Sequence, residues 1–279
     1  MATRGKKEIG SILIKVGTRT LEPTDLRPNG IAVCGDILMV TDWKAYKVYL
    51  YRLRDGMLLF SSYKLESCPR GMCSLNDTEI CVALKNATIE FMSVQEKCVI
   101  RRVRKVSLHP TLDRSDGVAA FRDKVVVCGV KGNDVCWYVV SIQEGLLDRV
   151  HKVCKGDESF LTTKQNMIYI SCYAGLLYSP DNNGVYGFNI SNLSQQPFRH
   201  NYKLSLPGGI TVDDNGFLFL CDGIGSIHHL TDKCDLVAIY TEGIPQRPCA
   251  IFWYREFLYV TDWTSNVFIM YQTQQANDE

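Results

Sequence analysis

Two Asp-Trp pairs, Asp42-Trp43 and Asp262-Trp263, are the residues whose types and positions most directly suggest a chemical role. Each pair ends a short run of β-branched and aromatic residues, and a polar turn follows it. An Asp side chain at such a turn can accept hydrogen bonds from backbone N–H groups two residues on. We therefore expect these carboxylates to fix turns rather than to bind metal. The Trp rings either pad the gap between neighbouring structural units or offer stacking surfaces to a ligand.

Cationic residues accompany aromatic residues in the segments expected to be loops. The candidate ligand-binding residues are Arg27, Trp43, Lys44, Tyr46, Arg70, Arg114, Lys131, Tyr173, Tyr178, Arg247 and Trp263. Cations beside exposed rings suit single-stranded RNA, because the cations meet phosphate and the rings stack on bases. Asp25, Asp113, Asp116 and Glu242 lie in the same segments, and a mixed surface is more typical of protein recognition. We expect a protein partner, with single-stranded RNA as the alternative and no membrane.

The strands that must position these residues recur along the chain. Six short apolar strands end at equivalent positions, which are Asp42, Ala83, Gly129, Ser171, Asp222 and Asp262. The intervals between them are roughly 40 to 50 residues, without helical periodicity, and this is typical of a β-propeller. Upstream of most of these strands lies a small residue at an expected chain reversal, as at Gly30 and Gly71.

We therefore predict an all-β fold, a six-bladed β-propeller with four antiparallel strands in each blade. The single domain spans residues 10–272, and its blades are about 29–65, 70–107, 116–153, 158–204, 208–240 and 249–272. The last blade has only three strands of its own, so we expect the apolar residues 10–16 to complete it and to close the ring. Residues 1–9 and 273–279 are expected to be flexible.

One segment departs from the repeat. Residues 173–184, YAGLLYSPDNNG, lengthen the fourth blade, and we expect them to form an inserted loop. Because the other loops follow the repeat more closely, this loop is the one most suited to specificity. The alternative is a tolerated surface insertion without a role.

The blade pattern resembles a known repeat family. The strings RPNGIAVCGDILMVTDWKAYKVYLY and PGGITVDDNGFLFLCDGIGSIHHL resemble the NHL repeat, in particular the NHL propeller at the C-terminus of tripartite-motif proteins. The similarity covers nearly the whole chain, although blades two to four keep only the hydrophobic spacing. The Asn-His-Leu signature after the Asp is absent, and Trp43-Lys44-Ala45 is one of the strings that replace it.

The resemblance implies a non-enzymatic recognition module that docks a protein partner or a ubiquitination substrate. Parent proteins of this family carry a RING ubiquitin-ligase domain, B-boxes and a coiled coil through which they oligomerise; we find none of these in this chain. In such propellers the loops that join fourth strand to first and second strand to third share one side of the ring. We call this side the loop face, and the candidate ligand-binding residues map onto it.

Enzyme signatures are missing from the sequence. It contains no H-E-x-x-H, G-x-S-x-G or P-loop pattern, and the five histidines are scattered. His228 and His229 are neighbours on an expected strand, so their side chains point to opposite faces. We expect no catalytic residue, no metal and no cofactor. A metal-dependent propeller hydrolase of the lactonase type remains an alternative, because Asp42, Asp222 and Asp262 are expected near the channel mouth.

The composition of the chain indicates the cellular compartment to expect. The net charge is +1, no apolar run approaches the roughly 18 residues of a membrane span, and the N-terminus lacks the apolar core of a signal peptide. The twelve cysteines form no C-x-x-C pair, which favours buried thiols in a reducing compartment. We therefore expect a cytoplasmic protein, whereas four sequons, at Asn76, Asn86, Asn189 and Asn192, leave an extracellular origin open.

Overall fold

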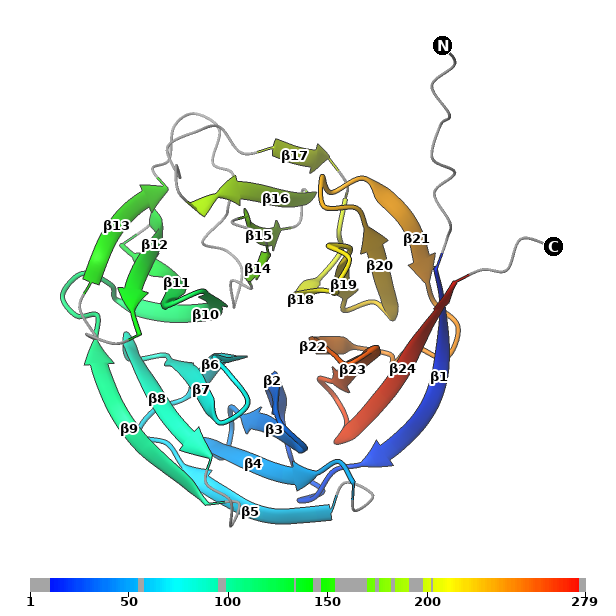
Figure 1. The fold of residues 1–279 in the computed structure, drawn as a ribbon, viewed down its shortest axis with the longest axis horizontal. Coiled ribbons are helices and arrows are strands. Elements are labelled where there is room, and N and C mark those ends of the chain that lie inside the picture. The colour runs from blue at the N-terminus through cyan, green and yellow to red at the C-terminus, as the bar shows by residue number, and fades with distance from the viewer. Residues whose placement is uncertain are drawn as a thin grey trace.

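The computed structural model describes residues 11–54, 58–94, 99–132, 134–142, 147–153, 170–173, 176–181, 184–190, 198–201 and 203–275. The described strands form six four-stranded sheets that stand around a central axis (Figure 1). In each sheet the first strand lies nearest the axis and the fourth lies on the outer rim (Figure 1). The predicted all-β propeller class is therefore confirmed. In the described part of the chain, no helix has the length and apolar character needed to cross a membrane.

The first three sheets follow the order of the chain. Sheet one comprises β2 (Pro28–Cys34), β3 (Ile37–Asp42), β4 (Lys47–Arg52) and β5 (Leu58–Lys64). Sheet two comprises β6 (Pro69–Ser74), β7 (Glu79–Leu84), β8 (Thr88–Val94) and β9 (Ile100–Ser107). Sheet three comprises β10 (Arg114–Phe121), β11 (Lys124–Lys131), β12 (Asp134–Ser141) and β13 (Leu147–Val153).

The other three sheets complete the ring. Sheet four comprises β14 (Ser171–Tyr173), β15 (Leu176–Asp181), β16 (Gly184–Asn189) and β17 (Phe198–Asn201). Sheet five comprises β18 (Pro207–Val212), β19 (Leu218–Asp222), β20 (Ser226–Leu230) and β21 (Leu236–Tyr240). Sheet six comprises β22 (Pro248–Tyr254), β23 (Phe257–Asp262), β24 (Val267–Gln275) and the N-terminal strand β1 (Ser11–Thr20).

The core lies in layers between neighbouring sheets. Every residue of β3 is buried, because both faces of its sheet pack against a neighbour, whereas the rim strand β5 is largely exposed or half-buried. Met39, Val82 and Met92 share the apolar layer between sheets one and two. A corresponding layer with Val40, Tyr51, Tyr259 and Phe268 joins sheet six to sheet one. A strand that is apolar on both faces is what such a stack of sheets requires.

Strand β1 closes the ring. It pairs antiparallel with β24, from Thr20 opposite Val267 to Ser11 opposite Gln275, so the predicted completion of the last blade is confirmed. Both strands are longer than predicted, and residues 273–275 belong to β24 rather than to a tail. Each added pair satisfies backbone N–H and C=O groups on both strands, which favours the extension. The other residues predicted to be flexible ends, 1–9 and 276–279, lie outside the described residues.

The fourth sheet differs from the prediction by one strand. Ser171 was expected to end the second strand of this sheet, but it begins β14, which is the first strand. The second strand is β15, and it lies inside the segment 173–184, so the predicted inserted loop is wrong. Ser179, Pro180 and Asp181 have the composition of a turn, but pairing with β16 makes them strand residues. The extra residues of this repeat therefore precede β14, where 154–169 lie outside the described residues.

The small residues upstream of the repeated strands also have a different role from the predicted one. Gly30 and Gly71 lie inside the first strands β2 and β6 rather than at chain reversals, and with Gly117 and Gly209 they line the axial channel. A Cβ atom on Gly71 would lie 2.7 Å from the backbone oxygen of Asp116, and one on Gly209 would lie 2.8 Å from that of Cys249. The inner strands approach too closely for a side chain there.

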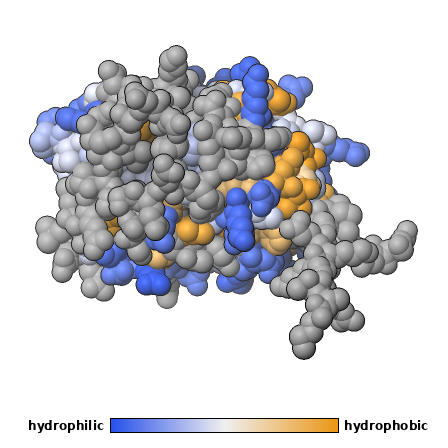
Figure 2. Space-filling model, turned by 90° about the horizontal axis from the view of Figure 1, so that it is seen from above, coloured by the Kyte–Doolittle hydropathy of each residue, from blue (hydrophilic) through white to orange (hydrophobic). Residues whose placement is uncertain are grey.

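The outer rim carries exposed apolar side chains. The view onto the rim in Figure 2 shows an orange apolar area among hydrophilic residues. Exposed apolar residues of the rim strands include Ile14 and Val16 on β1 and Leu236 and Ile239 on β21. Isolated apolar residues are normal on such strands, which pack on one side only.

Nine cysteines whose side chains the structure describes are buried, unbridged thiols. They are Cys34, Cys68, Cys73, Cys81, Cys128, Cys136, Cys221, Cys234 and Cys249. Burial raises the pKa of the Cys34, Cys73 and Cys249 thiols to about 12. Thiols with such a pKa are poor nucleophiles, so these residues serve packing.

Candidate functional site

Asp42 and Asp262 fix the turns that follow β3 and β23. Oδ1 of Asp42 accepts hydrogen bonds from the N–H groups of Lys44, at 2.8 Å, and Ala45, at 3.0 Å. Oδ1 of Asp262 accepts from the N–H groups of Thr264 and Ser265 in the same manner, at 2.7 and 3.0 Å. These contacts match the predicted structural role. Burial opposes ionisation of Asp262, but hydrogen bonds outweigh burial and lower the pKa of its carboxyl group.

The two turns hold Trp43 and Trp263 against each other. Their ring centroids are 5.9 Å apart and their planes differ by 17°, so the rings stack across the junction of sheets one and six. Backbone hydrogen bonds from Trp43 to Arg27 and from Trp263 to Arg247 tie each turn to the loop that precedes the first strand of its own sheet. Both rings are half-buried. The sequence left open whether these rings pad the gap between neighbouring units or offer stacking surfaces to a ligand. The pair does both, because one side of it fills the junction between sheets one and six while the rest is accessible.

Cationic and aromatic side chains surround this pair. Nη1 of Arg27 donates to the carbonyl of Thr264 at 3.0 Å, which links sheet one to the sheet-six turn. Lys44 and Arg247 are exposed. Tyr46 has a φ of 56° and is 40% exposed, and Nζ of Lys64 lies 5.4 Å from its ring centroid. The structure therefore brings together six of the predicted residues, Arg27, Trp43, Lys44, Tyr46, Arg247 and Trp263, on sheets one and six.

Two apolar residues extend this surface onto sheet five. Ile224 is 65% exposed in the turn between β19 and β20, and Leu206 is 53% exposed just before β18. The N–H of Gly223, the residue before Ile224, donates to the carbonyl of Leu206 at 2.8 Å, which places this turn beside Leu206. A Cβ on Gly225 would lie 3.5 Å from the carbonyl oxygen of Gln246, so this turn adjoins the loop that carries Arg247. Neither residue was among the predicted ligand-binding residues, although an isoleucine between two glycines in a turn was a usable signal.

We define the Trp surface by the exposed or half-buried residues of these three sheets on the loop face. Its members are Arg27, Trp43, Lys44, Tyr46, Leu206, Ile224, Arg247 and Trp263. It combines apolar, aromatic and cationic groups, which is the composition of a protein-binding surface.

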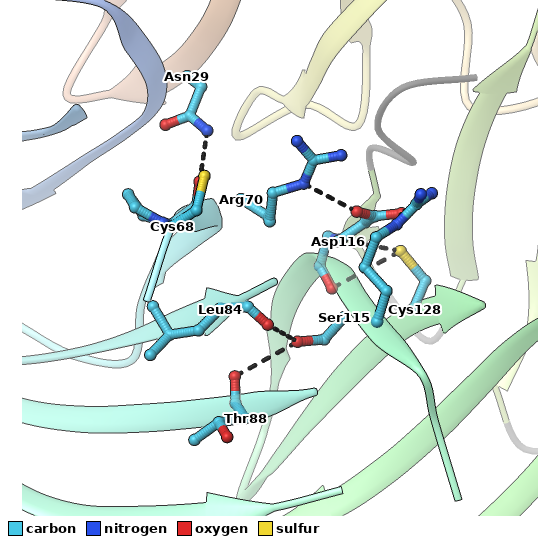
Figure 3. Close-up of polar contacts among 11 residues, drawn as sticks. Asn29, Cys68, Arg70, Leu84, Thr88, Ser115, Asp116 and Cys128 are labelled. Carbon is cyan, nitrogen blue, oxygen red and sulfur yellow. Dashed lines mark hydrogen bonds and ion pairs between the residues drawn. The ribbon is translucent and has the colours of Figure 1, made fainter. Parts of the chain in front are cut away.

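A second group of predicted residues lies at the mouth of the channel. Nε of Arg70 donates to Oδ1 of Asp116 at 3.0 Å, and Figure 3 shows this contact crossing from sheet two to sheet three. Arg114 donates to Oδ2 of the same carboxylate through Nε, at 2.9 Å, and Nη2, at 2.7 Å. Asp116 is fully buried, whereas the side chains of Arg70 and Arg114 are 14% and 25% exposed. We call these three residues the channel-mouth cluster.

The three remaining predicted residues belong neither to the Trp surface nor to the channel-mouth cluster. Lys131 forms an ion pair of 2.9 Å with Asp113, and the N–H of Gly132 donates to the other Asp113 oxygen at 2.7 Å. These two contacts lower the pKa of the Asp113 carboxyl group. Tyr178 is fully buried and its hydroxyl donates to the carbonyl of Asp232, so its prediction as a surface residue is wrong. Tyr173 lies in β14, and its side chain lies outside the described residues.

The buried polar residues of sheet five do not form a catalytic triad. Ser226 and Asp222 both approach Nε2 of His228, at 2.9 and 4.0 Å, whereas a triad needs the acid and the nucleophile on opposite ring nitrogens. All three side chains are buried. His229 stacks on Phe219 at 4.5 Å, and burial lowers its pKa to about 4. Among the described residues, no group of three or more His, Cys, Asp or Glu side chains could hold a metal ion.

Comparisons with known proteins support the architecture. No protein-family model matches the sequence, and no curated protein matches it. A virginiamycin B lyase from Staphylococcus aureus, solved with quinupristin, aligns with a TM-score of 0.63 at 18% identity over 91% of this chain and 83% of that chain. The Cps50 (Swd1) β-propeller domain of Myceliophteria thermophila aligns with a TM-score of 0.61 at 14% identity over 88% of this chain and 82% of that chain. BamB from Moraxella catarrhalis aligns with a TM-score of 0.58 at 12% identity over 94% of this chain and 100% of that chain. At these identities the likeness shows a shared propeller fold.

Proposed function

We propose that this chain is a non-enzymatic recognition module that docks a protein partner on its loop face, with the Trp surface at the centre of the contact. The observation that carries this proposal is the stacked Trp43–Trp263 pair, half-buried at a sheet junction and flanked by exposed Ile224 and Leu206. Rigid strands hold these groups in place, so binding them costs little ordering entropy. Aromatic and apolar anchors in such a setting are the usual hot spots of protein interfaces.

The family assignment is part of this proposal. The strand pattern of sheets one, five and six resembles the NHL repeat, and such a propeller would present a ubiquitination substrate to a tripartite-motif-like ligase in the cytoplasm. The topology of sheet six, which β1 completes, is compatible with this resemblance. A parent protein of this kind would supply the ligase chemistry through its RING domain, and this propeller would supply the choice of substrate.

Stacking geometry favours protein over single-stranded RNA. Bases need open ring faces, but Trp43 and Trp263 cover one face of each other, and Tyr178 is buried. Exposed Glu22, Asp25 and Glu242 on the same face would repel a continuous phosphate backbone. A folded or extended protein segment tolerates this mixture, because its charges are separated along the chain.

The test is a pulldown from nuclease-treated lysate of cells that express the protein. Proteins retained by the wild type should be lost with Trp43→Ala and with Ile224→Asp. The latter change affects a side chain that is 65% exposed, so it alters the surface with little effect on folding. Trp253→Ala is the matched control, because Trp253 is also half-buried and stacked, on Phe219, but lies near the β22–β23 turn on the opposite side. Retention of the same proteins by Ile224→Asp and Trp43→Ala would contradict the proposal.

A further inference from the structure

One backbone contact is repeated around the axis and defines a ring of equivalent positions. In four sheets of the described chain, the residue after the second strand donates its N–H to the carbonyl of the residue before the proline that opens the first strand. The pairs are Trp43 to Arg27, Lys85 to Cys68, Gly223 to Leu206 and Trp263 to Arg247, at 2.8 to 3.2 Å. First strands lie nearest the axis, so these residues form an inner ring on the loop face (Figure 1). Lys85 therefore takes in sheet two the place that the Trp rings take in sheets one and six.

This inner ring and the turn after Trp43 carry cations with open donors. The side chains of Lys44, Lys85 and Arg247 are exposed, and within the described part of the chain none of them forms an ion pair or a hydrogen bond. The guanidinium of Arg27 donates to a carbonyl at 3.0 Å, which does not neutralise its charge. An incoming anion would therefore meet ammonium and guanidinium groups that have no carboxylate partner to displace.

Buried carboxylates near the ring do not occupy these donors. Oδ1 of Asp42 and Oδ1 of Asp262 accept N–H groups of their own turns. Oδ2 of Asp262 accepts the backbone N–H of Arg247 at 3.1 Å, which leaves the guanidinium of that residue unused. The two oxygens of Asp222 accept backbone N–H groups of the loop before β18. These carboxylates offset part of the positive potential, but the cationic side chains above them stay available.

The exposed acids of sheet one lie farther from the axis than this ring. The carbonyl of Glu22 accepts a hydrogen bond from the hydroxyl of Tyr51 on β4, the third strand, at 2.6 Å. Asp25 lies near the same strand, since burial and then the charges of Asp42 and Asp25 raise the pKa of Tyr49. Both acids therefore stand over the third strand, whereas the cations stand over the first and second.

Glu242 has the corresponding outer position on sheet six. The carbonyl of the next residue, Gly243, accepts a hydrogen bond from the hydroxyl of Tyr271 on the third strand β24 at 2.8 Å. A Cβ on Gly243 would lie 3.7 Å from Cδ of Lys15 on the rim strand β1. The loop face of sheets one and six thus has an inner cationic zone and an outer acidic zone.

We infer that the Trp surface binds an acidic protein segment whose apolar anchor is flanked by Asp or Glu side chains. The anchor packs on the two stacked rings beside Ile224, and the carboxylates pair with Lys44 and Arg247. Lys44 directly follows Trp43, and Arg247 is bonded through its backbone to Trp263, so a cation flanks each ring. The outer acids repel carboxylates placed over them, so the acidic residues must lie next to the anchor. This inference rests on the proposed function and names the chemistry of the partner.

A phage-displayed library of random linear peptides, selected on the full chain, tests the acidic segment. Selected peptides should carry an apolar residue with Asp or Glu directly beside it. Fluorescence anisotropy then measures the affinity of fluorescein-labelled synthetic copies. Arg247→Gln should weaken binding by about fivefold, because it removes one exposed ion pair. The double variant Lys44→Glu and Arg247→Glu should weaken it by about tenfold or more, because like charges then face each other.

Matched changes in the peptide locate the contact. When the peptide acids are changed to amides one at a time, one change should weaken wild-type binding about as much as Arg247→Gln does. The same change should hardly affect binding to Arg247→Gln, since both changes remove one contact. A peptide with Lys in place of that acid should bind Arg247→Glu better than it binds the wild type. A misfolded variant could not show such a gain.

Controls separate this inference from the proposed function. Arg54→Gln removes the same charge from an 80% exposed side chain on the opposite side and should leave affinity unchanged. Peptides that need Trp43 but show no acidic residue beside the anchor and no effect of Arg247→Gln would refute the acidic segment and leave the docking function intact. Peptides that bind Trp43→Ala as well as the wild type would contradict both. Failure to select any peptide, or Arg247-dependent binding of a single-stranded RNA library instead, refutes the acidic segment as well.

Discussion

Two buried carboxylates on neighbouring sheets meet arginine in different ways. Both oxygens of Asp116 accept hydrogen bonds, from Arg70 at 3.0 Å and from Arg114 at 2.9 and 2.7 Å. Glu90 on β8 is equally buried, but it lies 3.7 Å from Arg102, and neither of its oxygens has a hydrogen-bond partner among the described residues. Burial raises the pKa of the Glu90 carboxyl group, which the charge of Arg102 only partly opposes.

The difference shows that the fold provides partners for the buried charge of Asp116 but not for that of Glu90. Glu90 and Met92 are two residues apart on β8, so their side chains point to the same face of the sheet. On that face Met92 packs in the apolar layer between sheets one and two. Arg102 itself turns outward to Glu66, with which it forms a hydrogen bond. A buried carboxylate without hydrogen bonds costs free energy, whereas one with two guanidinium partners regains much of that cost. Asp116 therefore belongs to a constructed site, and Glu90 is a tolerated charge.

Removing the charge of Asp116 should have the largest effect. Asp116→Asn removes the carboxylate that the mostly buried Arg70 and Arg114 share and leaves the two cations close together, so the free energy of unfolding should fall by about 3 kcal/mol. Urea denaturation measures this loss. Asp113→Asn is the control, because the Asp113–Lys131 pair is about half exposed and screened by solvent, so its loss should lower the free energy of unfolding much less. Equal effects of the two substitutions would remove the distinction between a constructed cluster and a surface pair.

Removing the charge of Glu90 should have a smaller effect of opposite sign. Glu90→Gln keeps the shape of the side chain but removes the buried charge, so the free energy of unfolding at neutral pH should rise by about 1 kcal/mol. Arg102 keeps its partner Glu66 in this variant. Urea denaturation of the variant and the wild type measures this change in the free energy of unfolding. A variant less stable than the wild type would mean that the Glu90–Arg102 pair stabilises the fold despite its longer distance.

The gain in the free energy of unfolding that Glu90→Gln brings should depend on pH. Because the folded pKa of Glu90 is raised above 4.5, folding favours its protonated form, and the penalty grows as pH rises from 4.5 through the folded pKa. The stability difference between Glu90→Gln and the wild type should increase over this range and then level off. His229 titrates with the opposite slope, because its pKa is lowered to about 4, but it contributes equally to both proteins and cancels. A difference that stays constant with pH would show that Glu90 ionises normally in the folded state.

Local patterns were sufficient to predict most strands and several site residues. The Asp at the end of β3 and β23 was predicted to fix a turn, and its acceptor contacts to Lys44 and Thr264 agree. That prediction succeeded because the interaction spans two residues. The fourth sheet was misread because Ser179 to Asp181 have turn composition, and only pairing with β16 makes them a strand. Tyr178 was misplaced for the same reason, since an assumed loop implied an exposed ring.

The amino-acid sequence by itself determined the alternation of apolar strands and turns, their spacing, and the unpaired N-terminal strand that the last sheet needs. These features follow from neighbours along the chain and from the requirement that strand edges be paired. Only the tertiary structure decided that Trp43 stacks on Trp263 and that Arg70 and Arg114 share Asp116. Contacts of this kind join residues from different sheets, and their partners are set by how the sheets pack around the axis rather than by any local preference of the chain.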